Sequence, residues 1–150
     1  MIGHADMPTE YGMLRLLIPL TDYGGAPLAA RHAAFLFSER CVSEVELLEV
    51  LAPAEYGRAA AFYSRNLLFR QEKRAMLSGL AQARAILDDA GVPYTSHVMI
   101  GDAAHTIAAR AAEKQADMVL MDASRFHFLR RMWMLVKLWR LTLTPVTLLH

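Results

Sequence analysis

Short apolar runs alternate along the chain with longer stretches in which apolar residues recur every three or four positions. The run LRLLIPL at residues 14–20 is rich in branched side chains and is followed by TDYGG, which is typical of a strand buried on both faces. Four later runs have the same character and predict strands at residues 44–51, 94–100, 116–122 and 145–150. Helical spacing predicts helices within residues 26–41, 58–90, 101–115 and 126–141.

Several of the predicted helices have recognisable ends. Pro27 suits the first turn of its helix, because the N–H that proline lacks has no helical partner there. Gly91, followed by Pro93, is predicted to cap the C-terminus of the helix before it. The carboxylate of Asp102 can accept a hydrogen bond from the first turn of the next helix, so it is predicted to be the N-cap.

Strands that alternate with helices predict a parallel sheet with helices on both faces, which is an open, doubly wound α/β fold with five strands. At 150 residues, of which 55% are hydrophobic and 21% charged, the chain can bury a full core as one domain. The polar stretch 1–12, broken by Pro8 and Gly12, is expected to be a flexible leader before a domain at residues 13–150. Ligands of such sheets bind at the carboxyl ends of the strands, near the point where the strand order reverses.

Charge is distributed unevenly along the chain. The net charge is only +1, which gives no sign of a nucleic-acid partner, but residues 123–150 contain five basic residues and no carboxylate. The apolar stretch 132–149 is interrupted by Lys137, Arg140 and Pro145, so a transmembrane helix is not expected. The single cysteine excludes an internal disulfide and, with no secretory signal visible, favours the cytoplasm.

Catalytic and metal-binding patterns are absent from the sequence. The six histidines are scattered, and no two of them lie three or four positions apart as the ligands of a helical metal site would. Ser124 lacks the flanking glycines of a nucleophile elbow. Neither an enzyme nor a metal protein is therefore expected.

The order and spacing of these elements resemble the universal stress protein family. The resemblance is carried by LLIPLTDYG at residues 16–24, by LLEVLAP at 47–53 and by AGVPYTSHVMIGDAAHTIAARAAEKQADMVLMD at 90–122. It implies the family's five-stranded parallel fold over residues 14–149. Many members of the family bind ATP, so the resemblance also implies where a nucleotide would lie.

By that resemblance, Asp22 would lie near an adenosine, Val50 would line the base, and Gly101 would allow close backbone approach. The family holds phosphates in a loop of pattern G-x2-G-x9-G-[ST] after the fourth strand, where glycine amides and a helix N-terminus face the anion. No glycine follows Gly101 in this chain, and Asp122 occupies the position of the first glycine of that loop. The expectation is therefore a member of the group that does not bind ATP well, with no cofactor, although an ATP- or AMP-binding regulatory switch remains the alternative.

Two of the candidate site residues have simpler roles open to them. Asp22 can end its strand and bond loop amides, as Asp commonly does in turns. Asp122 and Arg125 can form an ion pair that fills the place of the phosphates, or Arg125 can offset the carboxylate and admit an anionic ligand.

The stretch FHFLRRMWMLVKLWRL at residues 126–141 is predicted to be a helix packed on the sheet, with arginine stems lying along apolar surface. The alternative is a basic amphipathic surface for a membrane or a partner protein. In the packed arrangement the residues expected over the sheet are Phe128, Leu129, Met132, Leu135, Val136 and Trp139. Those expected to point partly outward are Trp133, Met134 and Leu141.

The final strand is the expected dimer edge. Family members commonly pair through this strand, and an exposed apolar edge strand needs a cover that a second subunit can supply. The resemblance therefore implies a homodimer that acts in stress responses through contacts with other proteins. The edge residues are Val146, Thr147, Leu148 and Leu149.

Overall fold

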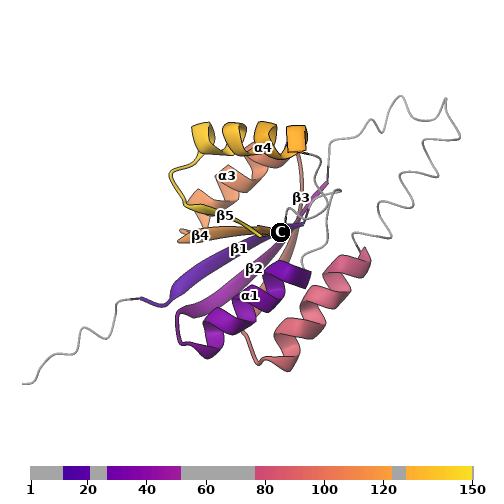
Figure 1. Ribbon diagram of the computed structural model, residues 1–150, viewed down its shortest axis with the longest axis vertical. Helices are drawn as coiled ribbons and strands as arrows, with labels where there is room; N and C mark the ends of the chain where they lie inside the picture. The colour runs from indigo at the N-terminus through magenta and orange to yellow at the C-terminus, as the bar shows by residue number, and fades with distance from the viewer. Residues whose placement is uncertain (1–11, 21–26, 52–76, 123–127, 150) are drawn as a thin grey trace, which may run out of the picture.

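The computed structural model describes residues 12–20, 27–51, 77–122 and 128–149, and the side chains of residues 128–131 lie outside this description. Within these residues the chain forms a parallel sheet of five strands with helices on both faces (Figure 1). The elements are β1 (Leu14–Leu20), α1 (Pro27–Ser38), β2 (Val42–Leu51), a helix over residues 77–89, β3 (Tyr94–Ile100), α3 (Ala103–Glu113), β4 (Met118–Asp122), α4 (Phe128–Leu141) and β5 (Val146–Leu149).

The strands lie in the order β3-β2-β1-β4-β5, and every neighbouring pair is parallel. The predicted α/β fold is therefore confirmed. The first strand extends as predicted, whereas β2 begins two residues earlier than the apolar run, because Leu14 already pairs with Val42. Nearly all of the predicted leader at residues 1–12 lies outside the described residues, as does the part of the predicted helix 58–90 that precedes residue 77.

The core has two layers, one on each face of the sheet. On one face, Ala29 and Ala33 of α1 and Leu87 of the helix over 77–89 pack against β1 and β2. On the other face, Ile107 of α3 and Leu138 of α4 do the same (Figure 1). The last five residues of β1 are buried because both layers cover them, which explains why that strand has a continuous apolar run.

Three helices are followed by a residue in the left-handed conformation, although only one of these residues is a glycine that the sequence identifies as a cap. Gly91 has φ +69°, and the N–H of Val92 donates to the carbonyl of Leu87, as in a Schellman cap. The predicted cap is therefore confirmed. Arg40 and Gln115 adopt the same left-handed conformation after α1 and α3, with φ values of 60° and 52°. Neither residue is a glycine, so neither position is recognisable from residue type.

The orientation of α4 differs from the prediction. Leu138 is fully buried, and Met134, expected to point partly outward, is half-buried against the same cluster. Trp139, expected over the sheet, is 83% exposed, and Met132 and Val136 are also exposed. Trp133 and Leu141 are exposed as expected. The prediction failed because α4 has apolar residues on all of its sides, so their spacing did not identify the face that packs on the sheet.

Candidate functional site

The carboxyl edge of the sheet contains the candidate site. Both β2 and β4 pair with β1, so the strand order reverses at β1, and the chain leaves the sheet in opposite directions there. Asp22 and Arg125, the residues predicted just after β1 and β4, lie outside the described residues. The described part of this edge consists of Val50 and Leu51 of β2, Gly101 and Asp102 after β3, and Asp122 of β4.

Asp102 is the N-cap of α3, as predicted. Its Oδ2 accepts hydrogen bonds from the backbone N–H of His105 at 3.2 Å and pairs with His105 Nδ1 at 2.7 Å. Its Oδ1 accepts a hydrogen bond from Lys137 Nζ of α4 at 3.0 Å. The imidazole of His105, then the Lys137 ammonium and the His105 amide, hold the pKa of Asp102 well below its usual value. The chain's own carboxylate therefore occupies the N-terminus of α3, which is where an anionic ligand would otherwise bind.

Gly101 lies against α3. A Cβ at this position would come within 2.6 Å of the hydroxyl oxygen of Thr106, which is itself buried. The close approach that favours a glycine here is therefore between Gly101 and the side chain of Thr106 in α3. This contact is sufficient to explain the glycine, and the ligand role of Gly101 stays a prediction.

The two other described candidates differ in exposure. Val50 is buried and packs in the cluster that contains Leu48, Ile107 and Met121. Asp122 is half-buried at the end of β4, where it pairs in register with Leu149 of β5. Their predicted roles beside a nucleotide stay predictions.

A buried ion pair between the middle of β2 and the C-terminal half of α3 was missed by sequence reasoning. Glu46 of β2 and Arg110 of α3 are each only 8% exposed. Glu46 Oε1 accepts hydrogen bonds from Arg110 Nε at 2.8 Å and pairs with Nη2 at 2.6 Å, while Nη1 reaches Glu113 at 3.2 Å. These contacts satisfy Arg110 and raise the pKa of its guanidinium above the usual value, chiefly through the bond to Glu46. No local signal identified the pair, because β2 contains three glutamates, Glu44, Glu46 and Glu49, and only packing beneath α3 shows that the carboxylate of Glu46 requires a cationic partner.

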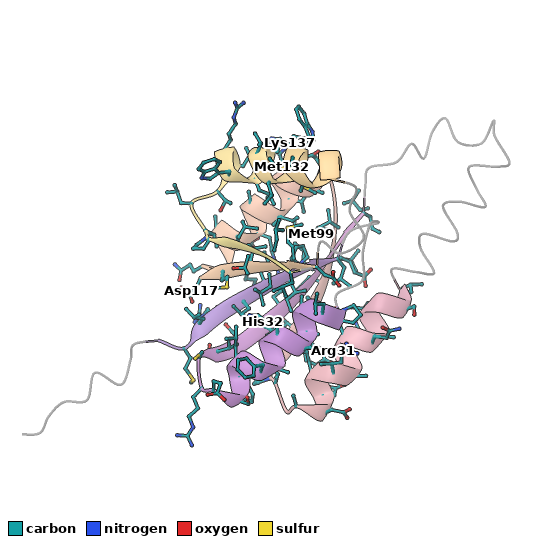
Figure 2. The ribbon with its side chains drawn as sticks, in the orientation of Figure 1. Arg31, His32, Met99, Asp117, Met132 and Lys137 are labelled. Atoms are coloured by element: carbon teal, nitrogen blue, oxygen red, sulfur yellow. The ribbon has the colours of Figure 1, made fainter. Side chains whose placement is uncertain are left out.

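A shallow hollow of about 390 Å³ lies on the other face of the sheet, between α1 and the edge strand β5. It brings Arg31 and His32, which Figure 2 labels on α1, beside two of the four predicted dimer-edge residues. All four of those residues are half-buried. The lining residues are Leu28, Arg31, His32, Phe35, Leu148 and Leu149.

The described residues form neither a metal site nor a membrane span. In that part of the chain no cluster of three or more His, Cys, Asp or Glu side chains is arranged to hold a metal ion. Nor does any helix there have the length and apolar character needed to cross a bilayer.

The strand order, the two helical layers and the reversal point beside β1 define a doubly wound α/β protein whose ligand edge lies at the carboxyl ends of its strands. Residues 13–136 match the universal stress protein family. Because this match covers most of the chain, the protein belongs to the universal stress protein family. Among curated proteins, no sequence matches the chain closely.

Solved structures share the fold at low sequence identity. A member of the universal stress protein family from Burkholderia pseudomallei matches with a TM-score of 0.63 and 18% identity, over 91% of this chain and 96% of that one. A universal stress protein in complex with cAMP gives a TM-score of 0.63 and 15% identity, over 93% and 99% of the two chains. The universal stress protein from Archaeoglobus fulgidus in complex with dAMP gives 0.59 and 16%, over 91% and 98%.

Proposed function

We propose that this protein is a universal stress protein of the group that binds ATP poorly, and that it acts in the cytoplasm as a homodimer through contacts with other proteins. Catalysis is not part of the proposed activity. The free thiol of Cys41 is exposed, in keeping with a reducing compartment. The proposal depends mainly on the short connection between β4 and α4.

That connection is too short for the family's phosphate loop. β4 ends at Asp122 and α4 begins at Phe128, which leaves residues 123–127 between them. The pattern G-x2-G-x9-G-[ST] does not fit into this length, and residues 123–127 contain no glycine. Asp122 also places a carboxylate at the start of the connection, where it would repel a phosphate. The N-terminus of α3 is already capped by Asp102.

The decisive experiment is a search for bound nucleotide. Protein purified without added ligand is denatured, and the released small molecules are identified by mass spectrometry. Thermal unfolding is then followed with ATP and Mg²⁺, AMP or cAMP at about 5 mM, where a ligand with a Kd equal to that concentration would stabilise by about 0.4 kcal/mol, or about 1 °C. We expect no co-purified nucleotide and a shift no larger than this.

The alternative, a nucleotide-binding switch, is favoured by the solved relatives that contain cAMP and dAMP. It predicts a shift of several degrees with AMP or cAMP even where ATP gives none. The Archaeoglobus fulgidus protein titrated with dAMP is the positive control for the assay. Co-purified nucleotide, or a saturable shift of several degrees, would replace our proposal with this one.

The homodimer rests on the edge strand β5. It pairs with β4 alone in the described sheet, and its half-buried residues border the hollow next to α1. A second β5 paired antiparallel would cover that edge and continue the sheet. We expect sedimentation equilibrium to give the mass of a dimer at tens of micromolar, and Leu148→Glu to shift the mass toward the monomer.

Leu143→Glu is the matched control for this variant. Leu143 is fully exposed and lies three residues before β5, so the same charge there should leave the mass unchanged. A monomeric wild-type protein would contradict the dimer proposal directly, whether or not the Leu148→Glu variant folds.

A further inference from the structure

The outer face of α4 exposes more apolar surface than packing on the sheet requires. Trp139 and Trp133 are 83% and 71% exposed, and Met132 and Val136 are 46% and 40% exposed. Figure 1 shows α4 as the outermost element on its side of the sheet, beyond α3. Contiguous apolar surface of this kind on a folded domain usually marks an interaction site.

The exposed side chains form a band along the helix. At about 100° per residue, Trp139, Met132, Val136 and Trp133 fall within about 120° of arc, and they extend about 10 Å along the axis. Lys137 lies about 160° from Trp139, on the flank that bonds Asp102 at the N-terminus of α3. The band therefore projects from a convex helix, away from α3.

The charges carried by α4 itself all have one sign. Arg140 is exposed in the last turn of α4, and Arg130, Arg131 and Lys137 also belong to the helix, which contains no carboxylate. Residues 123–150 as a whole have a net charge of +5, which leaves −4 for residues 1–122, since 11 basic residues there face 15 acidic ones. At about 100° per residue Arg140 falls inside the arc of the band, and such a mixture of apolar and cationic side chains complements a surface that is apolar beneath an anionic layer.

The charge of α4 distinguishes between the possible binding partners of its outer face, which are a second copy of the chain, a segment of another protein and a lipid bilayer. A second copy would bring the same face of both subunits together across a two-fold axis, so Arg140 of each α4 would meet another helix that contains no carboxylate. A convex helix with projecting indole rings also offers no groove for a partner segment to enter. An anionic bilayer accepts the cations at its headgroups and the indole rings at its interface, which is the depth that tryptophan prefers.

We propose that the outer face of α4 docks this protein on anionic lipid membranes. The helix lies flat on the bilayer, with Trp133 and Trp139 inserted at headgroup depth and the guanidinium of Arg140 among the lipid phosphates. If β5 pairs antiparallel with its copy, the two-fold axis is perpendicular to the sheet, and both α4 helices lie on the same face. Both could then contact one membrane and strengthen the attachment.

Intrinsic fluorescence tests the proposal directly, because Trp133 and Trp139 are the two tryptophans of the chain. The full-length protein is titrated with vesicles of phosphatidylcholine containing about a third phosphatidylglycerol, and with vesicles of phosphatidylcholine alone. We expect a blue shift of the emission and co-sedimentation with the anionic vesicles only, both weakened by salt. Quenching by brominated lipid acyl chains should show that the rings insert.

Two variants and two matched controls separate the contribution of the cation from that of the tryptophans to vesicle binding. Arg140→Gln should weaken binding to the anionic vesicles about fivefold, the effect of one cation at such a surface. Replacing both tryptophans with glutamine should weaken binding by at least about tenfold, since binding scales with inserted apolar area. Arg84→Gln and Leu77→Gln change an exposed cation and an exposed apolar side chain of the helix over residues 77–89, on the opposite face of the sheet, and should have no effect.

Three outcomes would overturn the proposal. The first is the absence of both a blue shift and co-sedimentation with anionic vesicles. The second is equal binding to neutral vesicles, which would remove the role of the cations. The third is an emission already blue-shifted without lipid and dependent on protein concentration, which would mean that a second copy, or another protein in the sample, covers α4. Circular dichroism of each variant confirms that the fold is intact before binding is compared.

Discussion

Breaking the buried pair between Glu46 and Arg110 should destabilise the domain strongly. In Arg110→Met the carboxylate of Glu46, 8% exposed, loses both of the guanidinium bonds that it makes at 2.8 Å and 2.6 Å. Leaving one partner of a buried pair uncompensated typically costs about 3–5 kcal/mol. A domain of this size is stable by about 5–15 kcal/mol in total, so this single change could remove half of its stability.

The double variant Glu46→Leu with Arg110→Met should behave differently. It removes both charges and fills the space with apolar side chains, which is often neutral or stabilising relative to an intact buried pair. The double variant is therefore expected to be at least about 2 kcal/mol more stable than Arg110→Met alone. His97, whose Nε2 lies 3.7 Å from the same Glu46 oxygen, is too distant and too exposed to replace the guanidinium.

Urea unfolding followed by far-ultraviolet circular dichroism measures these differences. Tryptophan emission is a poor probe here, because both rings are already exposed in the folded protein. Arg15→Met is the matched control: it breaks an exposed arginine–glutamate pair, with 3.1 Å between Arg15 and Glu44, and should cost less than about 1 kcal/mol. The reasoning is refuted if Arg110→Met is as mild as this control, or if the double variant is less stable than the single one.

Two further predictions concern the edge of the sheet near α3. Asp102→Ala should lower the free energy of unfolding by about 1 kcal/mol at neutral pH through loss of the N-cap. Because the pKa of Asp102 is depressed in the folded state, its carboxylate stabilises the fold above the unfolded pKa of about 3.9, and this contribution is lost as the pH falls further. The wild type and the variant should thus converge in thermal stability below about pH 4, and a gap that widens on acidification would contradict this. Gly101→Ala should cost about 1–3 kcal/mol by overpacking against Thr106, and adding Thr106→Ala should recover most of the loss in a double-mutant cycle; no recovery would mean that another contact requires the glycine.

The sequence predicted β1, β2 and β4 well because most of their residues are buried between the two helical layers. Continuous apolar runs such as residues 14–20 mark such strands without help from tertiary contacts. Their spatial order, β3-β2-β1-β4-β5, was not predicted, because no local pattern states which strands are neighbours. The cap at Asp102 could be predicted since it depends on a bond to a residue three positions away. The bond from Lys137 to the same carboxylate joins positions 35 apart and could not.

The pair of Glu46 and Arg110, 64 positions apart, was missed for the same reason. Each residue alone resembles an ordinary surface charge. Glu46 becomes informative only when β2 is known to be covered by α3, because burial then requires a cation beside it. The predicted roles of Asp22 and Arg125 fall outside the described residues, and those of Val50, Gly101 and Asp122 depend on a ligand.

The orientation of α4 determines which of the residues that follow the short β4–α4 connection lie on the outer surface of the protein. This helix has apolar residues on all of its sides, so their spacing in the sequence did not decide which face packs on the sheet. In the structure that face is the one that carries Leu138 and Met134. Once they face the sheet, helical geometry places Trp133 and Trp139 outside. In a domain with no partner at this face, two exposed tryptophans on a helix whose own charges are all cationic would favour aggregation. If the protein binds nucleotides poorly, as we propose, the basic residues after the connection have no nucleotide phosphate to bind there. Lipid phosphates at the outer face of α4 would give both the cations and the indole rings a partner.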